Sequence, residues 1–100
     1  MRDVILGFIR RFHQCRDIPS IVDVFTNGCC YWFAYILHAR FPDSEIVYSD
    51  RFIHFATKID GIVYDIRGIV PSQDEYVSWE EFRKADETHA DRIIRDCINF

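Results

Sequence analysis

An Asp-Gly pair at positions 60 and 61 constrains the fold of this chain more than any other feature, because it separates two β-rich stretches. Residues 52–59 before the pair and residues 62–67 after it are rich in β-branched and aromatic side chains. Such a pair between such stretches favours a two-residue type I′ turn, in which both central residues need positive φ angles. The sequence therefore predicts a β-hairpin centred on Asp60-Gly61.

The register of this hairpin determines which side chains share a face of the sheet. With a two-residue loop, Ile59 faces Ile62, and further from the turn Ala56 faces Asp65. Because side chains alternate across a strand, His54 and Asp65 are then diagonal neighbours on one face, with Cα atoms about 7–8 Å apart. A three-residue loop would instead send Asp65 to the opposite face. That opposite face is the expected core face, and it holds Ile53, Phe55, Thr57, Ile59, Ile62, Tyr64 and Ile66.

Helical patterns lie on both sides of the hairpin. Apolar spacing predicts helices at residues 2–14, 30–40, 79–85 and 87–98. A short strand is expected at residues 45–48, and a loop at residues 68–75. The third of these helices follows Ser78, and Glu81 three residues later completes a capping box. Helices, then a small antiparallel sheet, then short C-terminal helices indicate an α+β fold, and 100 residues are enough for a single domain, residues 1–100.

The composition excludes several classes of function. Lys and Arg number 12 and Asp and Glu 16, for a net charge of −4, which lacks the basic surface expected of a nucleic-acid-binding protein. No stretch approaches the roughly 18 apolar residues of a membrane span. The N-terminal apolar run carries Asp3 and is broken by Arg10 and Arg11, so it does not resemble a signal peptide. We therefore expect a cytoplasmic protein with neither nucleic acid nor membrane as partner, and an apolar fraction of 49% leaves a homodimer open.

The four cysteines of the chain differ in their sequence context. Thiols of a chain that is not exported stay reduced, and the adjacent Cys29 and Cys30 have a poor spacing for structural zinc, so we expect no metal and no cofactor. Cys15 and Cys97 lie in apolar-periodic stretches, where a free cysteine acts as a small hydrophobic side chain. Cys30 stands at the predicted start of a helix, where unpaired N–H groups and the helix dipole lower the pKa of a thiol. Cys30, His54 and Asp65 then supply a nucleophile, a base and an orienting carboxylate.

Two segments of the chain resemble a known family. Residues 27–34, with the sequence NGCCYWFA, and residues 54–68, with the sequence HFATKIDGIVYDIRG, are similar to the core of papain-like cysteine hydrolases. The resemblance is to the small transglutaminase-like and NlpC-like members of bacteria and phages. Members of that family place the nucleophilic cysteine at the start of a helix packed on an antiparallel sheet. Their histidine lies on the next core strand, and an Asp or Asn on the strand after it orients the ring.

This resemblance implies site residues for the present chain. It makes Cys30 the nucleophile, His54 the general base and Asp65 the orienting residue, although the adjacent Cys29 remains an alternative nucleophile. The glutamine that many papain-like enzymes carry shortly before the cysteine is missing. The backbone N–H of Cys30 is therefore one candidate oxyanion donor, and the side chain of Asn27 is a second.

Three classes of function are compatible with these features. The first, which we expect, is a cysteine peptidase or amidase: a hydrolase or acyl transferase that cleaves an amide, peptide or isopeptide bond of a peptide or protein substrate through a thioester. The second is a non-catalytic binding or inhibitor protein of a phage or mobile element on the same scaffold. The third is a zinc or redox-thiol protein that uses Cys29, Cys30 and His54.

Overall fold

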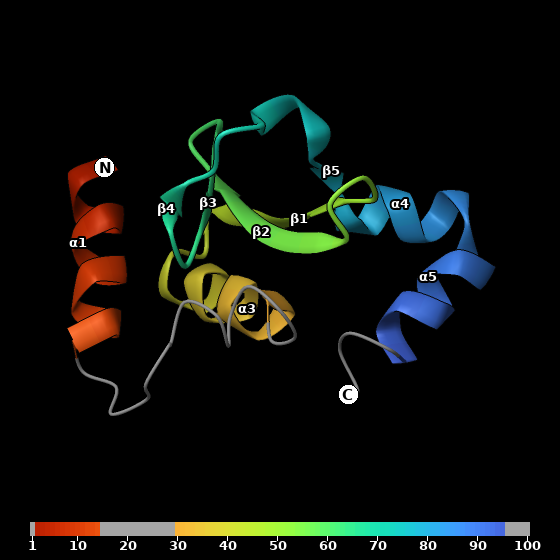
Figure 1. The fold of residues 1–100 in the computed structure, drawn as a ribbon, viewed down its shortest axis with the longest axis horizontal. Helices are drawn as coiled ribbons and strands as arrows, with labels where there is room; N and C mark the ends of the chain where they lie inside the picture. The colour runs from red at the N-terminus through yellow and green to blue at the C-terminus, as the bar shows by residue number, and fades with distance from the viewer. Residues whose placement is uncertain (1, 15–29, 96–100) are drawn as a thin grey trace.

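The structure is a computed structural model that describes residues 2–14 and 30–95. These residues form an α+β fold, as the sequence predicts, in which helices pack around a five-stranded antiparallel sheet (Figure 1). The strand order is β4-β3-β2-β1-β5. In chain order the elements are α1 (Arg2–Gln14), α3 (Cys30–Arg40), β1 (Ser44–Ser49), β2 (His54–Ile59), β3 (Ile62–Asp65), β4 (Gly68–Ile69), the 3₁₀ turn η1 (Gln73–Glu75), β5 (Val77–Ser78), α4 (Trp79–Ala85) and α5 (Glu87–Ile93).

The helices surround the sheet on one face and at both ends. Helix α3 lies against one face of the sheet, α1 stands beside the β4 end, and α4 and α5 lie at the β5 end (Figure 1). No helix within the described ranges is both long enough and apolar enough to cross a bilayer. The predicted helix at residues 87–98 is observed as α5 up to Ile93, and residues 96–98 lie outside the described part.

The hairpin forms with the predicted turn. Asp60 and Gly61 have φ angles of 51° and 80°, both positive as a type I′ turn requires. Ile59 pairs with Ile62, and the register continues to Thr57 opposite Tyr64. The predicted register, which decides which side chains of the two strands share a face, is therefore confirmed.

Both strands of the hairpin are shorter than the sequence predicts. The first begins at His54 rather than at residue 52, because Ile53 turns the chain with a φ of 50°. The second ends at Asp65, and Gly68, with a φ of 106°, reverses the chain into β4. A glycine tolerates this conformation without strain because it has no Cβ atom. The predicted loop at residues 68–75 was therefore wrong in part, since it contains β4 and η1.

The core occupies both faces of the hairpin. On the face toward α3, Thr57 donates a hydrogen bond from Oγ1 to the carbonyl oxygen of Ala34 at 2.8 Å. The side chains predicted for this face are buried with two exceptions: Ile62 is only partly buried, and Ile53 is 63% exposed because it lies in the turn before β2. The opposite face is buried as well. It carries a cluster of four side chains, Val47, Ala56, Val63 and Val70, and Tyr76 packs against this cluster.

Candidate active site

Cys30 is the first residue of α3, and its side chain is buried in the core at 5% exposure. The first N–H groups of a helix have no intrahelical acceptor, so they are free to donate elsewhere. The Cys30 sulfur accepts the N–H of Tyr31 and the N–H of Phe55, and it is hydrogen-bonded to the His54 ring. Cys30 is a free thiol. The sulfur is therefore surrounded by groups that favour its thiolate form.

The N–H of Phe55 is available to Cys30 because the hairpin opens at this point. Extending the observed register, Phe55 would face Ile66 and donate to its carbonyl oxygen. That carbonyl oxygen instead accepts a hydrogen bond from Nε2 of His13 at 2.7 Å. Strand β3 has already ended at Asp65, and the start of β2 therefore presents a backbone donor to the cysteine.

His54 lies at the start of β2, on the stretch that extends beyond the paired part of β3, opposite Ser49 of β1. Its Nε2 atom is 2.9 Å from Oδ2 of Asp65, and the side chains are only 6% and 3% exposed. The diagonal placement predicted from the hairpin register is confirmed. Since Nε2 is directed to Asp65, the other ring nitrogen, Nδ1, remains for Cys30.

Asp65 is fixed by a second partner that the sequence interpretation missed. The backbone N–H of Arg67 donates to Oδ1 of Asp65 at 2.7 Å, and Nε of the Arg67 side chain donates to Oδ2 at 2.9 Å. The Nη2 atom of Arg67 also donates to Oδ2. An Asp side chain that accepts from the backbone two residues later forms an Asx turn, and this turn leads into Gly68. The spacing Asp65-x-Arg67-Gly68 is the sequence pattern from which this turn could have been predicted.

These contacts shift the pKa values of the three groups. Burial raises the pKa of the Cys30 thiol, but the hydrogen bond and charge of His54 and the N–H groups of Phe55 and Tyr31 bring it below 9.0. Burial lowers the pKa of His54, yet its contacts with Asp65 and Cys30 raise it to about 9. Burial raises the pKa of Asp65, whereas hydrogen bonds from His54 and Arg67 bring it below 3.8. The environment thus favours a thiolate–imidazolium pair beside an ionised carboxylate.

Tyr76 is an aromatic side chain in contact with His54, and nothing in the sequence singled it out. It follows η1, and its ring centroid lies 6.4 Å from that of His54 in an edge-to-face arrangement. It reaches the site from the sheet face opposite α3, where it packs against the cluster of Val47, Ala56, Val63 and Val70.

Several residues of the sequence interpretation lie outside the described ranges: Cys15, Asn27, Cys29 and Cys97. The structure therefore gives the geometry of Cys30 alone among the cysteines. Within residues 2–14 and 30–95, no group of three or more His, Cys, Asp or Glu side chains is arranged to hold a metal ion.

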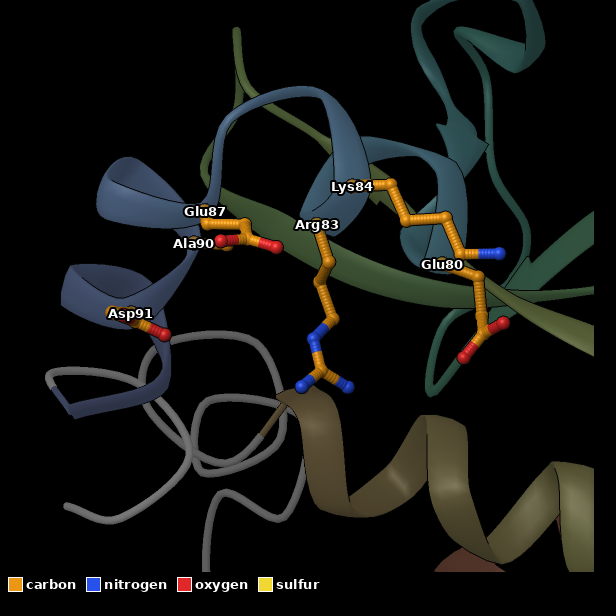
Figure 2. A pocket seen from close by; sticks show the side chains of 6 residues that line it. All are labelled: Glu80, Arg83, Lys84, Glu87, Ala90 and Asp91. Carbon is orange, nitrogen blue, oxygen red and sulfur yellow. The ribbon is translucent and has the colours of Figure 1, made fainter.

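A hollow between α4 and α5 is separate from this site (Figure 2). The Arg83 side chain extends into it, and both acidic and basic side chains line it. Its lining consists of Glu80, Arg83, Lys84, Glu87, Ala90 and Asp91. Neither Cys30, His54 nor Asp65 belongs to that lining.

Comparison with protein families assigns most of the chain to a family. The model of the Phage YunG-like protein family matches residues 8–97, a stretch that includes Cys30, His54, Asp65 and Tyr76. No curated protein and no solved structure matches the chain. Since the match spans most of the chain, this protein belongs to the Phage YunG-like protein family.

Proposed function

We propose that this protein is a cysteine-dependent hydrolase or acyl transferase of papain-like type, acting on an amide, peptide or isopeptide bond. The observation that carries the proposal is the continuous set of contacts from Cys30 through His54 to Asp65. A nucleophile, a base and a group that orients the base are the three parts of such a catalyst. The resemblance of the segments at 27–34 and 54–68 to papain-like enzymes supports the same assignment.

The proposed reaction proceeds through a thioester. The Cys30 thiolate adds to the carbonyl carbon of the substrate, and the electrons of the C=O π bond move to the oxygen. The tetrahedral intermediate collapses when the C–N bond breaks, and the leaving amine takes the proton held by His54. Water or a second amine then attacks the thioester, transfers a proton to His54 and releases the acyl product from the sulfur.

Asp65 has an orienting role in this scheme. Its carboxylate accepts from Nε2 of His54 and so keeps the other nitrogen toward the sulfur. It also stabilises the imidazolium ion during proton transfer. Arg67 holds the carboxylate in place through three hydrogen bonds and lowers the pKa of Asp65, so that the proton stays on His54.

The test is the rate of Cys30 alkylation by iodoacetamide as a function of pH, measured by peptide mass mapping. This reagent is small enough to suit a buried thiol. At pH 6.5 we expect Cys30 of the native protein to react about tenfold faster than an unperturbed thiol, because more of it is thiolate. His54→Ala should move the rate profile to higher pH. His89→Ala is the matched control, since His89 also contacts an aspartate, Asp50 at 3.0 Å, but outside the site.

Two outcomes would overturn the proposal. Equal labelling of all four cysteines of the native protein would show that the environment does not activate Cys30. The second outcome is that the Cys30→Ala variant keeps the biological activity of the native protein. That result would indicate a binding or inhibitor protein on this scaffold.

A further inference from the structure

Tyr76 presents a hydroxyl group that has no hydrogen-bond partner among residues 2–14 and 30–95. The side chain is partly buried, and its ring packs against Val47, Ala56, Val63 and Val70. A tyrosine in such a position normally directs its hydroxyl group to a polar partner. The ring is edge-to-face with His54, with 6.4 Å between centroids. The ring that carries this unpaired donor therefore lies beside the candidate base.

The backbone N–H groups beside Cys30 and three donors of Arg67 already have acceptors. The N–H groups of Tyr31 and Phe55 are directed to the Cys30 sulfur. Arg67 directs its backbone N–H, Nε and Nη2 to Asp65. The Tyr76 hydroxyl, by contrast, has no acceptor among the described residues and is available to donate to a ligand.

The electrostatic surroundings keep this hydroxyl protonated. Burial and the negative charges of Asp65 and Cys30 raise the pKa of Tyr76, partly offset by Arg67, to about 12. The hydroxyl group is therefore a donor throughout the neutral range.

The backbone on both sides of Tyr76 is held in place. Its own N–H donates to the carbonyl oxygen of Gln73 at 3.4 Å. The Gln73 side chain is anchored to the sheet, where it accepts from Val63 N–H at 2.8 Å and donates to the Val63 and Val70 carbonyl oxygens. The next residue, Val77, pairs with Tyr48 of β1. Donors fixed in this way stabilise a developing charge without reorganisation.

We propose that Tyr76 is a further catalytic residue, whose hydroxyl group donates a hydrogen bond to the carbonyl oxygen of the acyl substrate as the Cys30 thiolate adds to it. The inference rests on the proposed function and deepens it. As the S–C bond forms, the π electrons move to the oxygen, and the Tyr76 hydroxyl stabilises the resulting oxyanion. The oxyanion then re-forms the carbonyl group as the leaving group departs. Tyr76 would thus take the role for which the sequence offered Asn27 and the Cys30 N–H.

The experiment compares two reagents for Cys30 that differ in their transition states. Acetylation by p-nitrophenyl acetate forms an oxyanion, because the sulfur adds to a carbonyl carbon. Alkylation by iodoacetamide forms none, because the sulfur displaces iodide from a CH₂ group. Tyr76→Phe retains the ring and its packing but removes the hydroxyl group. Tyr35→Phe is the matched control, since Tyr35 is 51% exposed on α3.

For Tyr76→Phe we expect acetylation of Cys30 to slow by about a hundredfold, the typical effect of losing one oxyanion donor, while alkylation stays within about twofold. Tyr35→Phe should change neither rate. An unchanged acetylation rate in Tyr76→Phe would overturn the proposal, and so would an equal loss of both rates, which indicates a structural role. If Cys30 of the native protein reacts with both reagents no faster than an unperturbed thiol, the proposed function itself fails.

Discussion

The Nε2 atom of His54 and the Oδ2 atom of Asp65 lie 2.9 Å apart on one face of the central hairpin. A two-residue turn at Asp60-Gly61 brings them together, because it sets the register of the two strands and so the face on which each side chain lies. Both side chains are almost fully buried, so little water competes for this contact. A hydrogen bond to an ionised partner is stronger than one between neutral groups, and here it fixes the orientation of the His54 ring.

Asp65→Asn should weaken the activation of Cys30. The variant keeps a side chain of the same shape but removes the charge that contributes to the raised pKa of His54. The pKa of His54 then falls from about 9, and the pKa of the Cys30 thiol rises because the imidazolium is less populated. A change of one pKa unit corresponds to about a tenfold slower alkylation at pH 6.5. Asp50→Asn, which alters the exposed contact with His89, should leave the alkylation rate unchanged.

The same carboxylate should make the stability of the fold depend on pH in the acid range. The pKa of Asp65 in the folded protein lies below its ordinary value of 3.8. The unfolded chain therefore binds the proton more readily, and the stabilisation is present above pH 3.8 and is lost as pH falls through the folded-state pKa. Urea unfolding from pH 7 to pH 2 should show a smaller acid-induced decrease in the free energy of unfolding for Asp65→Asn. Equal slopes in both proteins would contradict this prediction.

Ile53→Asn should stabilise the protein. Ile53 has a φ of 50°, a left-handed conformation that β-branched residues rarely adopt, and its side chain is 63% exposed. Asparagine tolerates this conformation, so relief of the strain should raise the free energy of unfolding by about 1 kcal/mol, or about 4–8 °C in Tm. Val77→Asn is the control, since Val77 is an exposed strand residue without positive φ. Equal effects of the two substitutions on Tm would show that Ile53 is not strained.

Gln73→Ala should destabilise the fold and disturb the site. It removes three hydrogen bonds to Val63 and Val70 and leaves the N–H of Val63 without this acceptor. An unsatisfied, partly buried backbone group costs about 1–3 kcal/mol, which chemical denaturation measures directly. Because Gln73 holds the backbone before Tyr76, acetylation of Cys30 should slow as well. Asp74→Ala, at the neighbouring exposed position of η1, should change neither quantity.

The sequence was sufficient for the hairpin and for the contact within it. The turn at Asp60-Gly61 depends on local backbone preferences, and the placement of His54 beside Asp65 follows from strand alternation once the turn is known. The helix α3 was likewise predictable from the apolar spacing of residues 30–40.

The remaining parts of the site depend on contacts between segments without a periodic pattern. Tyr76 reaches His54 because Gln73 anchors the preceding turn to the sheet, and no spacing rule predicts such a contact. The donation from Phe55 to Cys30 accompanies a hydrogen bond from His13 of α1 to the carbonyl oxygen of Ile66. That arrangement joins residues far apart in the chain, so local sequence preferences do not contain it.

The most direct test of the account is a titration of the His54 ring by ¹⁵N NMR, with His54→Gln used to assign its signals among the four histidines. In the native protein the ring should titrate with a pKa of about 9, because it is paired with the Asp65 carboxylate and the Cys30 thiolate. In Cys30→Ser the pKa should be lower, since the thiolate charge is gone. A His54 ring that titrates near 6.5 in both proteins would contradict the thiolate–imidazolium pair on which the proposed chemistry depends.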